Sequence, residues 1–302
     1  MAYRIRPDKD FTNEFRNAAE GELREAIDLL EQTPKGIHEA VHDARKNIKR
    51  LRALYRLIAK AEPEFRKREN ARLRDAAGSL STVRDAEALV ENCRYLCEHA
   101  RSEEEKSALQ RVTDIMIARR NWLEETEREL PERMKAVVGA LFEAIDAVKD
   151  VSFDQGRRHN ARMLEKAWRR TGRSLSATLA ECHGEASAET FHELRKRMQD
   201  CRHYHSLLRD IWPSAMRARR STAKELAEIL GHIHDFSVLS ALVNSEPQLF
   251  TRNDDLAFLL DALIFQEQKA RKEALVAAEE FLAEDPDREA ARIGLLWLDA
   301  AN

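Results

Sequence analysis

Apolar residues recur every three to four positions along nearly the whole chain, which is the period of one face of an α-helix. Proline marks some of the breaks, as at Pro63 and Pro213, because it removes a backbone donor and disfavours helix in the residue before it. The pattern predicts helices over 10–32, 36–60, 64–98, 102–130 and 132–149, and then over 155–183, 187–211, 214–244, 252–283 and 287–300. Short turns between long helices favour antiparallel neighbours, so we expect an all-α fold built from up-and-down helical bundles.

One set of residues occurs twice, 150 positions apart in a chain of 302 residues. The matching pairs are His42 and His192, Arg45 and Arg195, Lys46 and Lys196, Pro63 and Pro213, Leu80 and Leu230, and Asp85 and Asp235. Internal repetition is a strong guide to architecture. We therefore expect a duplication of about 150 residues, with a first helical-bundle repeat over 1–150 and a second over 151–302, each with a core of its own. The link between them is expected between Asp150 and Gly156.

The repeated segment carries positive charge along one side of a helix. At about 100° per residue, the apolar residues from Val41 to Ile58 share a core face, and a narrow polar stripe lies beside it. The first stripe holds His38, His42, Arg45, Lys49, Arg52 and Arg56, and the second holds His192, Arg195, Gln199 and Arg202. Like charges one turn apart repel by a few tenths of a kcal/mol per pair. The stripe therefore favours a polyanion-binding face over an ordinary solvated face.

Composition narrows the choice of partner. The net charge is −3, so the protein is not a globally basic nucleic-acid binder. The positive charge is local, since six Lys and Arg stand against one acid, Asp43, between His42 and Arg56. The four cysteines lack the spacing of a zinc finger or a disulfide framework and are expected to be reduced. With no signal-peptide pattern and no run of about 18 apolar residues, we expect a cytoplasmic protein that does not span a membrane.

These motifs resemble the CHAD family, the conserved histidine α-helical domain. The resemblance covers nearly the whole chain and rests on three features. They are His-x-x-Arg-Lys at His42 and His192, Leu-(Gly/Ser)-x-x-(Arg/His)-Asp at Leu80–Asp85 and Leu230–Asp235, and the basic cluster Trp168–Arg173. It implies two four-helix bundles related by a pseudo-twofold, together one CHAD domain, with a basic groove or pore between them.

Three positions depart from the pattern. The first copy has Ser81 where the second has Gly231, and the second copy has Gln199 and Asp200 where the first has Lys49 and Arg50. One copy is therefore expected to bind more tightly than the other.

The resemblance also implies a ligand, inorganic polyphosphate, and an association with polyphosphate granules and with polyphosphate-metabolising enzymes. Carried over by position, the binding residues are His42, Arg45, Lys46, Lys49 and Arg52 in the first copy and His192, Arg195, Lys196 and Arg202 in the second, with Arg56, Arg169 and Arg173 as additions. Arg grips phosphate oxygens bidentately, Lys acts as a point charge, and His donates a hydrogen bond. Because the Glu-x-Glu-x-Lys motif of the CYTH triphosphatases found in some relatives is missing, we expect binding without catalysis and without a cofactor.

Other interpretations of the same residues stay open. Nucleic acid or an acidic protein could bind this face, because phosphate contacts carry no sequence information, although the stripe lacks the aromatics of a single-strand platform. The pairs His42-Asp43 and His234-Asp235 could belong to a metal-dependent phosphohydrolase, but the cations around His42 disfavour a metal ion. If His42 and His192 take part in binding, affinity should rise as the pH falls from about 8 to about 6.

Overall fold

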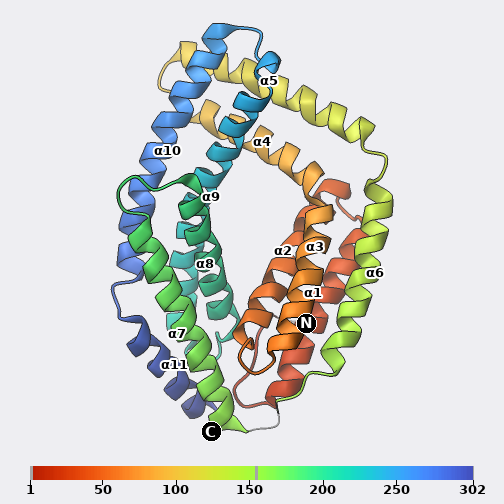
Figure 1. Cartoon of the computed structure of the whole chain (residues 1–302), viewed down its shortest axis with the longest axis vertical. Coiled ribbons are helices and arrows are strands. Elements are labelled where there is room, and N and C mark those ends of the chain that lie inside the picture. Colours follow the sequence, from red (N-terminus) through yellow and green to blue (C-terminus); the bar gives the residue numbers. More distant parts are fainter. Residues whose placement is uncertain (1–2, 154–155, 302) are drawn as a thin grey trace.

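The computed structural model describes residues 3–153 and 156–301, and within them the side chains of all residues except 82–84. In these ranges it holds eleven α-helices, one short 3-10 helix and no strand, so the all-α prediction is confirmed (Figure 1). The helices are α1 (Phe11–Gln32), α2 (Ile37–Leu57), α3 (Pro63–Ser79), α4 (Ser81–Glu98), α5 (Glu103–Thr126), α6 (Leu130–Lys149), α7 (Arg157–Glu181), α8 (Ala188–Leu207), α9 (Pro213–Ser245), η1 (Pro247–Leu249), α10 (Asn253–Phe281) and α11 (Pro286–Ala300).

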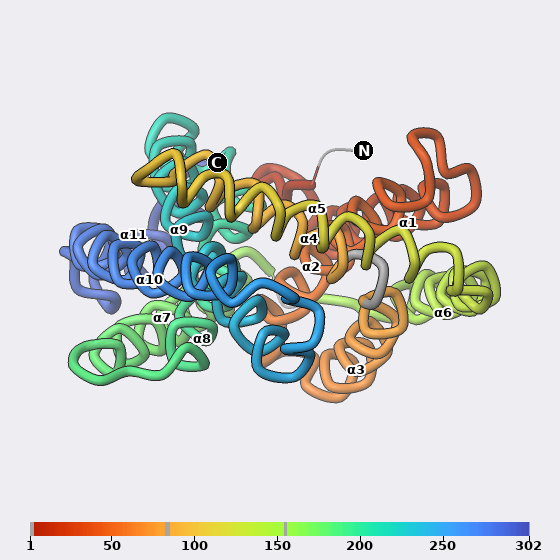
Figure 2. The backbone as a smooth tube through the Cα atoms, turned by 90° about the horizontal axis from the view of Figure 1, so that it is seen from above, coloured from red at the N-terminus to blue at the C-terminus, as the bar shows by residue number. Residues whose placement is uncertain are grey.

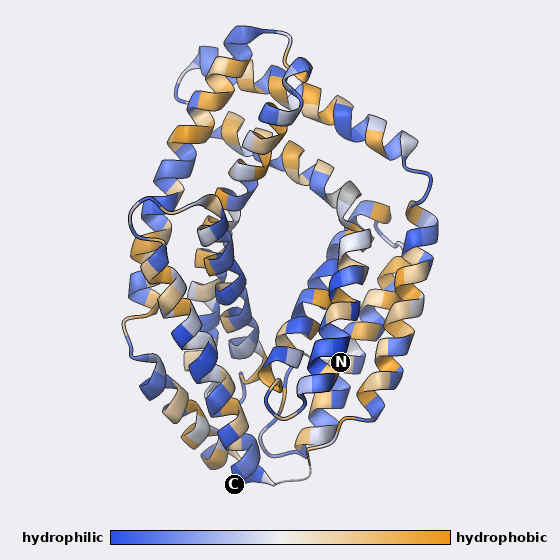
Figure 3. Cartoon of the chain, viewed as in Figure 1, coloured by the Kyte–Doolittle hydropathy of each residue, from blue (hydrophilic) through white to orange (hydrophobic). Residues whose placement is uncertain are grey.

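The helices form two sides joined at one end. One side holds α1, α2, α3 and α6, and the other holds α7, α8, α11 and parts of α9 and α10 (Figure 1). At the far end α4 and α5 cross from the first side and pack against α9 and α10, which the view from above also shows (Figure 2). Hydrophilic residues are concentrated along α2 and α8, where these helices face the middle of the molecule (Figure 3).

The predicted helix over 64–98 is two helices in the structure. It breaks at Leu80, whose φ of −99° and ψ of 11° end α3 and precede α4. Gly78 and Ser79 stand just before the break, and both are weaker helix formers than alanine or leucine. Because of this break, α3 packs beside α6, whereas α4 runs across to the second side of the molecule. The corresponding stretch of the second half is the single helix α9, although the starts of α3 and α9, at Pro63 and Pro213, keep the 150-residue spacing.

The hydrophobic cores do not follow a boundary at residue 150. The largest cluster joins α1, α2, α3 and α6 to the start of α7, to residues 204–216 and to α11. A second cluster joins α4 and α5 to parts of α9 and α10, and a third lies among α7, α8, α9 and α10. Two of the three clusters therefore contain residues of both halves, whereas the sequence predicts a separate core for each half.

Helix α9 is long and apolar enough to cross a membrane by length and composition, unlike the other helices in the described ranges. Half of its apolar window is buried inside the fold. Leu226, Leu230, Ile233 and Phe236 all lie in the cores.

Candidate anion-binding site

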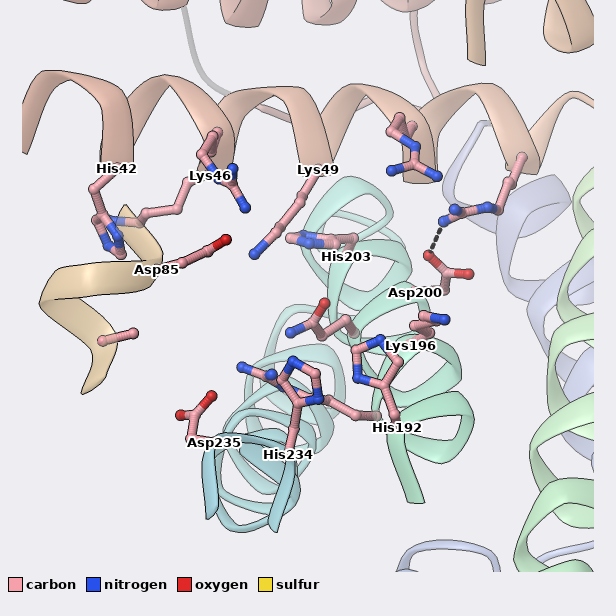
Figure 4. Close-up of a pocket in the computed structure, with 16 residues that line it drawn as sticks. His42, Lys46, Lys49, Asp85, His192, Lys196, Asp200, His203, His234 and Asp235 are labelled. Carbon is pink, nitrogen blue, oxygen red and sulfur yellow. Dashed lines mark hydrogen bonds and ion pairs between the residues drawn. The ribbon is translucent and has the colours of Figure 1, made fainter. Parts of the chain in front are cut away.

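The two basic stripes meet at one groove. It has a volume of about 390 Å³ and lies between α2 and α8, with one end of it formed by α4 and α9. Its lining residues are His42, Arg45, Lys46, Lys49, Arg52 and Arg56 of α2, Asp85 and Ala88 of α4, His192, Arg195, Lys196, Gln199, Asp200 and His203 of α8, and His234 and Asp235 of α9. Figure 4 shows His42 and Lys49 of α2 and His192 and His203 of α8 extending into the space between the helices.

Burial of the neighbouring apolar face fixes the direction in which each stripe points. On α2, Val41, Ile48 and Leu51 are fully buried against the first side of the molecule. On α8, Leu194 and Met198 are fully buried against α7 and α9. Burying each such side chain stabilises the fold by about 1.5–3 kcal/mol. Turning either helix so that its basic stripe left the groove would expose several of these side chains and lose that stabilisation.

The groove is strongly positive. In the described lining, seven Lys and Arg stand against three Asp, a net charge of +4 with the histidines neutral. Burial lowers the pKa of Arg52, and the nearby charge of Arg56 lowers it further. Burial also lowers the pKa of Arg195. Both cations are partly desolvated, and Arg52 is also crowded by like charge, so an anion placed beside Arg52 relieves an existing repulsion.

Two histidines of the groove, His192 and His203, are neutral at physiological pH. Burial, together with His234, lowers the pKa of His192 to about 4, and the two rings stack with centroids 4.1 Å apart. Burial and the charge of Arg202 lower the pKa of His203 to about 3. In the free protein His192 therefore takes up its proton well below the range of pH 8 to 6 that the sequence predicts.

Two buried nitrogen atoms in the groove lack a hydrogen-bond partner within the described residues, Nδ1 of His192 and Nε of Arg195. The Arg195 guanidinium lies against α9 at Gly231, where an added Cβ would stand 3.4 Å from its Nη2 atom. Helix α9 thus packs directly against the Arg195 guanidinium at the edge of the groove.

Asp200 pairs with Arg56 across the groove. The Arg56 Nη1 atom donates to Oδ1 of Asp200 at 2.5 Å (Figure 4). Burial raises the pKa of Asp200, and Arg56 opposes that rise. The matching residue of the first copy, Arg50, turns toward α1 instead and pairs with the buried Glu22 at 3.0 Å. The two copies therefore differ in charge at this position, and each charge has a partner.

A model of the CHAD domain matches residues 18–244. The chain belongs to the CHAD domain family. The crystal structure of the CHAD domain from the plant Ricinus communis is similar, with a TM-score of 0.52 over 98% of this chain and 94% of that chain. At 17% sequence identity this likeness shows the fold alone. No curated protein matches the chain in a sequence comparison.

Three of the predicted CHAD binding residues do not line the groove. Arg169 and Arg173 both lie beside Asp287 of α11, which pairs with each of them. Arg202 is on α8 but outside the lining, where burial and Arg220 lower its pKa. The other nine predicted residues come together in the groove: His42, Arg45, Lys46, Lys49, Arg52, Arg56, His192, Arg195 and Lys196.

Several lining residues were not predicted to bind. His203 stands where the first copy has Ala53, so a comparison of the two copies does not reveal it. The spacing of His192, Lys196, Gln199 and His203, alternately four and three positions, is the signal that marks this face of α8. Asp85 and Asp235, which belong to the repeated motif, and His234 also line the groove, although none of them was predicted to bind polyphosphate. The Arg84 side chain of the same motif lies outside the described residues.

The metal-binding interpretation finds no cluster to support it. In the described part of the chain, no group of three His, Cys, Asp or Glu residues is placed to hold a metal ion. His38 lies 3.1 Å from Glu124, and His232 stacks on Tyr95. Cys93 and Cys97 are free thiols, and burial raises the pKa of Cys93 to about 12.

Proposed function

We propose that this CHAD protein binds inorganic polyphosphate in the groove between α2 and α8 and does not catalyse its turnover. The observation that carries the proposal is the convergence of two basic helices, far apart in the sequence, on one groove with a net charge of +4. A linear polyanion presents many equivalent phosphates, so weak contacts to several cations add along one chain.

The side chains suit phosphate oxygens. Arg52 and Arg195 are half-buried guanidinium groups that can each hold two oxygen atoms, while Lys49 is exposed and adds a mobile charge. His192 and His203, neutral at physiological pH, can each donate one hydrogen bond. The Asp200 carboxylate is paired with Arg56, and among the described residues Asp85 and Asp235 belong to no group of three His, Cys, Asp or Glu that could hold the metal ion of a phosphohydrolase.

We place this activity in the cytoplasm, at polyphosphate granules, with polyphosphate-metabolising enzymes as possible partners of a scaffold protein. The resemblance to the family supports that setting. We also propose that the two halves arose by internal duplication, which the 150-residue spacing of the motifs and of the starts of α3 and α9 supports.

The test compares long-chain polyphosphate, duplex DNA and single-stranded RNA at about 150 mM salt, where loose electrostatic contacts are already weakened. The double variant K49Q/R195Q removes one cation from each basic helix, and K67Q/K269Q removes two exposed lysines outside the groove. A preference for polyphosphate that only the first variant loses would support the proposal. Equal binding of all three polymers, or binding of none, would refute it in favour of general polyanion binding or a protein partner.

A further inference from the structure

A second pocket opens directly beside the groove. It has a volume of about 550 Å³ and lies among the end of α2, the start of α3, α7 and α8. Arg56 and Asp200 line both the groove and this pocket, so the two spaces meet at that ion pair. The other lining residues are Ala59, Lys60, Pro63, Arg66, Arg170, Thr171, Ser174, Arg197 and Tyr204.

This second pocket is also positive. Its described lining contains five Lys and Arg and one carboxylate, Asp200. Arg197 lies 3.4 Å from Glu193, outside the pocket. In contrast, no carboxylate of the described residues lies within 4.0 Å of a side-chain nitrogen of Lys60, Arg66 or Arg170. The three cations thus come from different elements and share one pocket without acidic partners.

The arginines of the pocket have bonded or buried nitrogen atoms, although Arg170 as a whole is exposed. The Arg170 Nη2 atom donates to the backbone oxygen of Arg56 at 2.7 Å, which ties α7 to the end of α2. The Nε atoms of Arg66 and Arg197 are buried, and neither has a hydrogen-bond partner among the described residues. The charge of Arg66 also contributes to lowering the pKa of Arg52 in the adjoining groove. An anion in this pocket would satisfy these donors and relieve the repulsion.

We propose that this pocket is a second phosphate-binding subsite that holds the continuation of the polyphosphate chain bound in the groove. The inference rests on the function proposed above and extends it to chain length. A chain that reaches past the Arg56–Asp200 pair contacts both sites, and its second contact is intramolecular, so it forms at a high effective concentration. A short chain fills the groove alone. The protein is therefore selective for long chains over short ones.

The experiment compares tripolyphosphate with long-chain polyphosphate by isothermal titration calorimetry. The variant R66Q/R170Q removes two cations from the second pocket, and K49Q/R195Q removes two from the groove. We expect R66Q/R170Q to weaken long-chain binding at least about tenfold and to leave tripolyphosphate binding unchanged. K49Q/R195Q should weaken both, and K67Q/K269Q neither. The single variant K60Q changes an exposed side chain and should weaken long-chain binding about threefold, so the test does not depend on the folding of the double variant.

The outcomes separate this inference from the proposed function. Unchanged long-chain affinity in both R66Q/R170Q and K60Q would overturn the second subsite, and so would an equal loss of tripolyphosphate binding. In either case the loss of binding in K49Q/R195Q would still test polyphosphate binding in the groove. If the wild-type protein binds neither ligand, the proposed function itself fails, and the second subsite fails with it.

Discussion

Replacing Asp200 with asparagine should lower the free energy of unfolding of the free protein and raise its affinity for polyphosphate. The Asp200 carboxylate is almost fully buried, while its partner Arg56 keeps about a quarter of its side chain exposed. Removing one partner of a fully buried pair costs about 3–5 kcal/mol. Because Arg56 is partly solvated, we expect about 2 kcal/mol here, which lowers the melting temperature by about 3 °C in a chain of 302 residues.

The same change removes a negative charge from the wall shared by the groove and the second pocket. The net charge of the described groove lining rises from +4 to +5, and Arg56 becomes available to phosphate. At an effective dielectric constant of about 20, a unit charge about 5 Å away contributes about 3 kcal/mol before screening by salt. We expect about half of this to survive, which is a gain of about tenfold in long-chain affinity.

Thermal unfolding with and without polyphosphate, together with calorimetry, measures both effects. Asp146 of α6 provides the control, since it pairs with Lys149 at 2.7 Å and both residues lie outside the groove lining. D146N should change stability by less than about 1 kcal/mol and leave affinity unchanged, because both partners are exposed. If D200N lowers the melting temperature but leaves affinity equal to or below that of the wild type, Asp200 does not compete with the ligand and the reasoning is wrong.

Three further predictions concern pH and backbone space. Burial lowers the pKa of His192 to about 4, and a bound anion raises it, so the affinity for polyphosphate should rise mainly below about pH 6. Affinity measured at a series of pH values tests this. The prediction is wrong if the wild type binds more tightly at about pH 6 than at about pH 8 and H192Q does not. Burial lowers the pKa of His205 to about 4, and its Nδ1 donates to the Cys201 oxygen. The neutral His205 ring therefore contributes fully to stability above about pH 6.5, and this contribution falls by about 3 kcal/mol toward pH 4. In urea unfolding, the free energy of unfolding of H205L should fall less between these pH values than that of the wild type. An equal fall would show that His205 is not the cause. G231A should raise the melting temperature slightly, since alanine favours helix, and leave polyphosphate affinity unchanged, because the added Cβ would meet Nη2 of Arg195 at 3.4 Å, an ordinary van der Waals contact. A clear loss of affinity in calorimetry would show that Arg195 needs the empty space at residue 231.

The helices and the α2 stripe could be predicted because both are local properties. Apolar period and charge spacing lie within one element, and α2 turns the residues of that stripe into the groove from His42 to Arg56. The break at Leu80 is different, because Gly78 and Ser79 permit an end to the helix without requiring it. What decides the path of α4 is its packing against α5 and α9, and α9 lies more than a hundred residues away in sequence.

The family resemblance predicts Arg169 and Arg173 as binding residues, but in the structure both pair with Asp287 outside the groove lining. Asp287 lies 114 residues after Arg173, so a local window of sequence does not contain it. His203 differs in the opposite way, because it lines the groove but has no histidine counterpart in the first copy. Contacts between distant parts of the chain decide both placements, and neither a local window nor the repeat contains them.

The positive charge of the groove does not follow from an excess of basic residues. The chain has 54 acidic residues and 51 Lys and Arg, and many of its arginines pair with a carboxylate. Arg52 and Arg195 in the groove, and Arg66 and Arg170 in the second pocket, have no carboxylate within 4.0 Å in the described structure. The fold supplies carboxylates to many other arginines but places none within 4.0 Å of these four in the described structure, so it gives up the stability that ion pairs would add there. That loss is recovered only when an anion binds, and a single anion that recovers it in both spaces must be long enough to reach past Arg56 and Asp200.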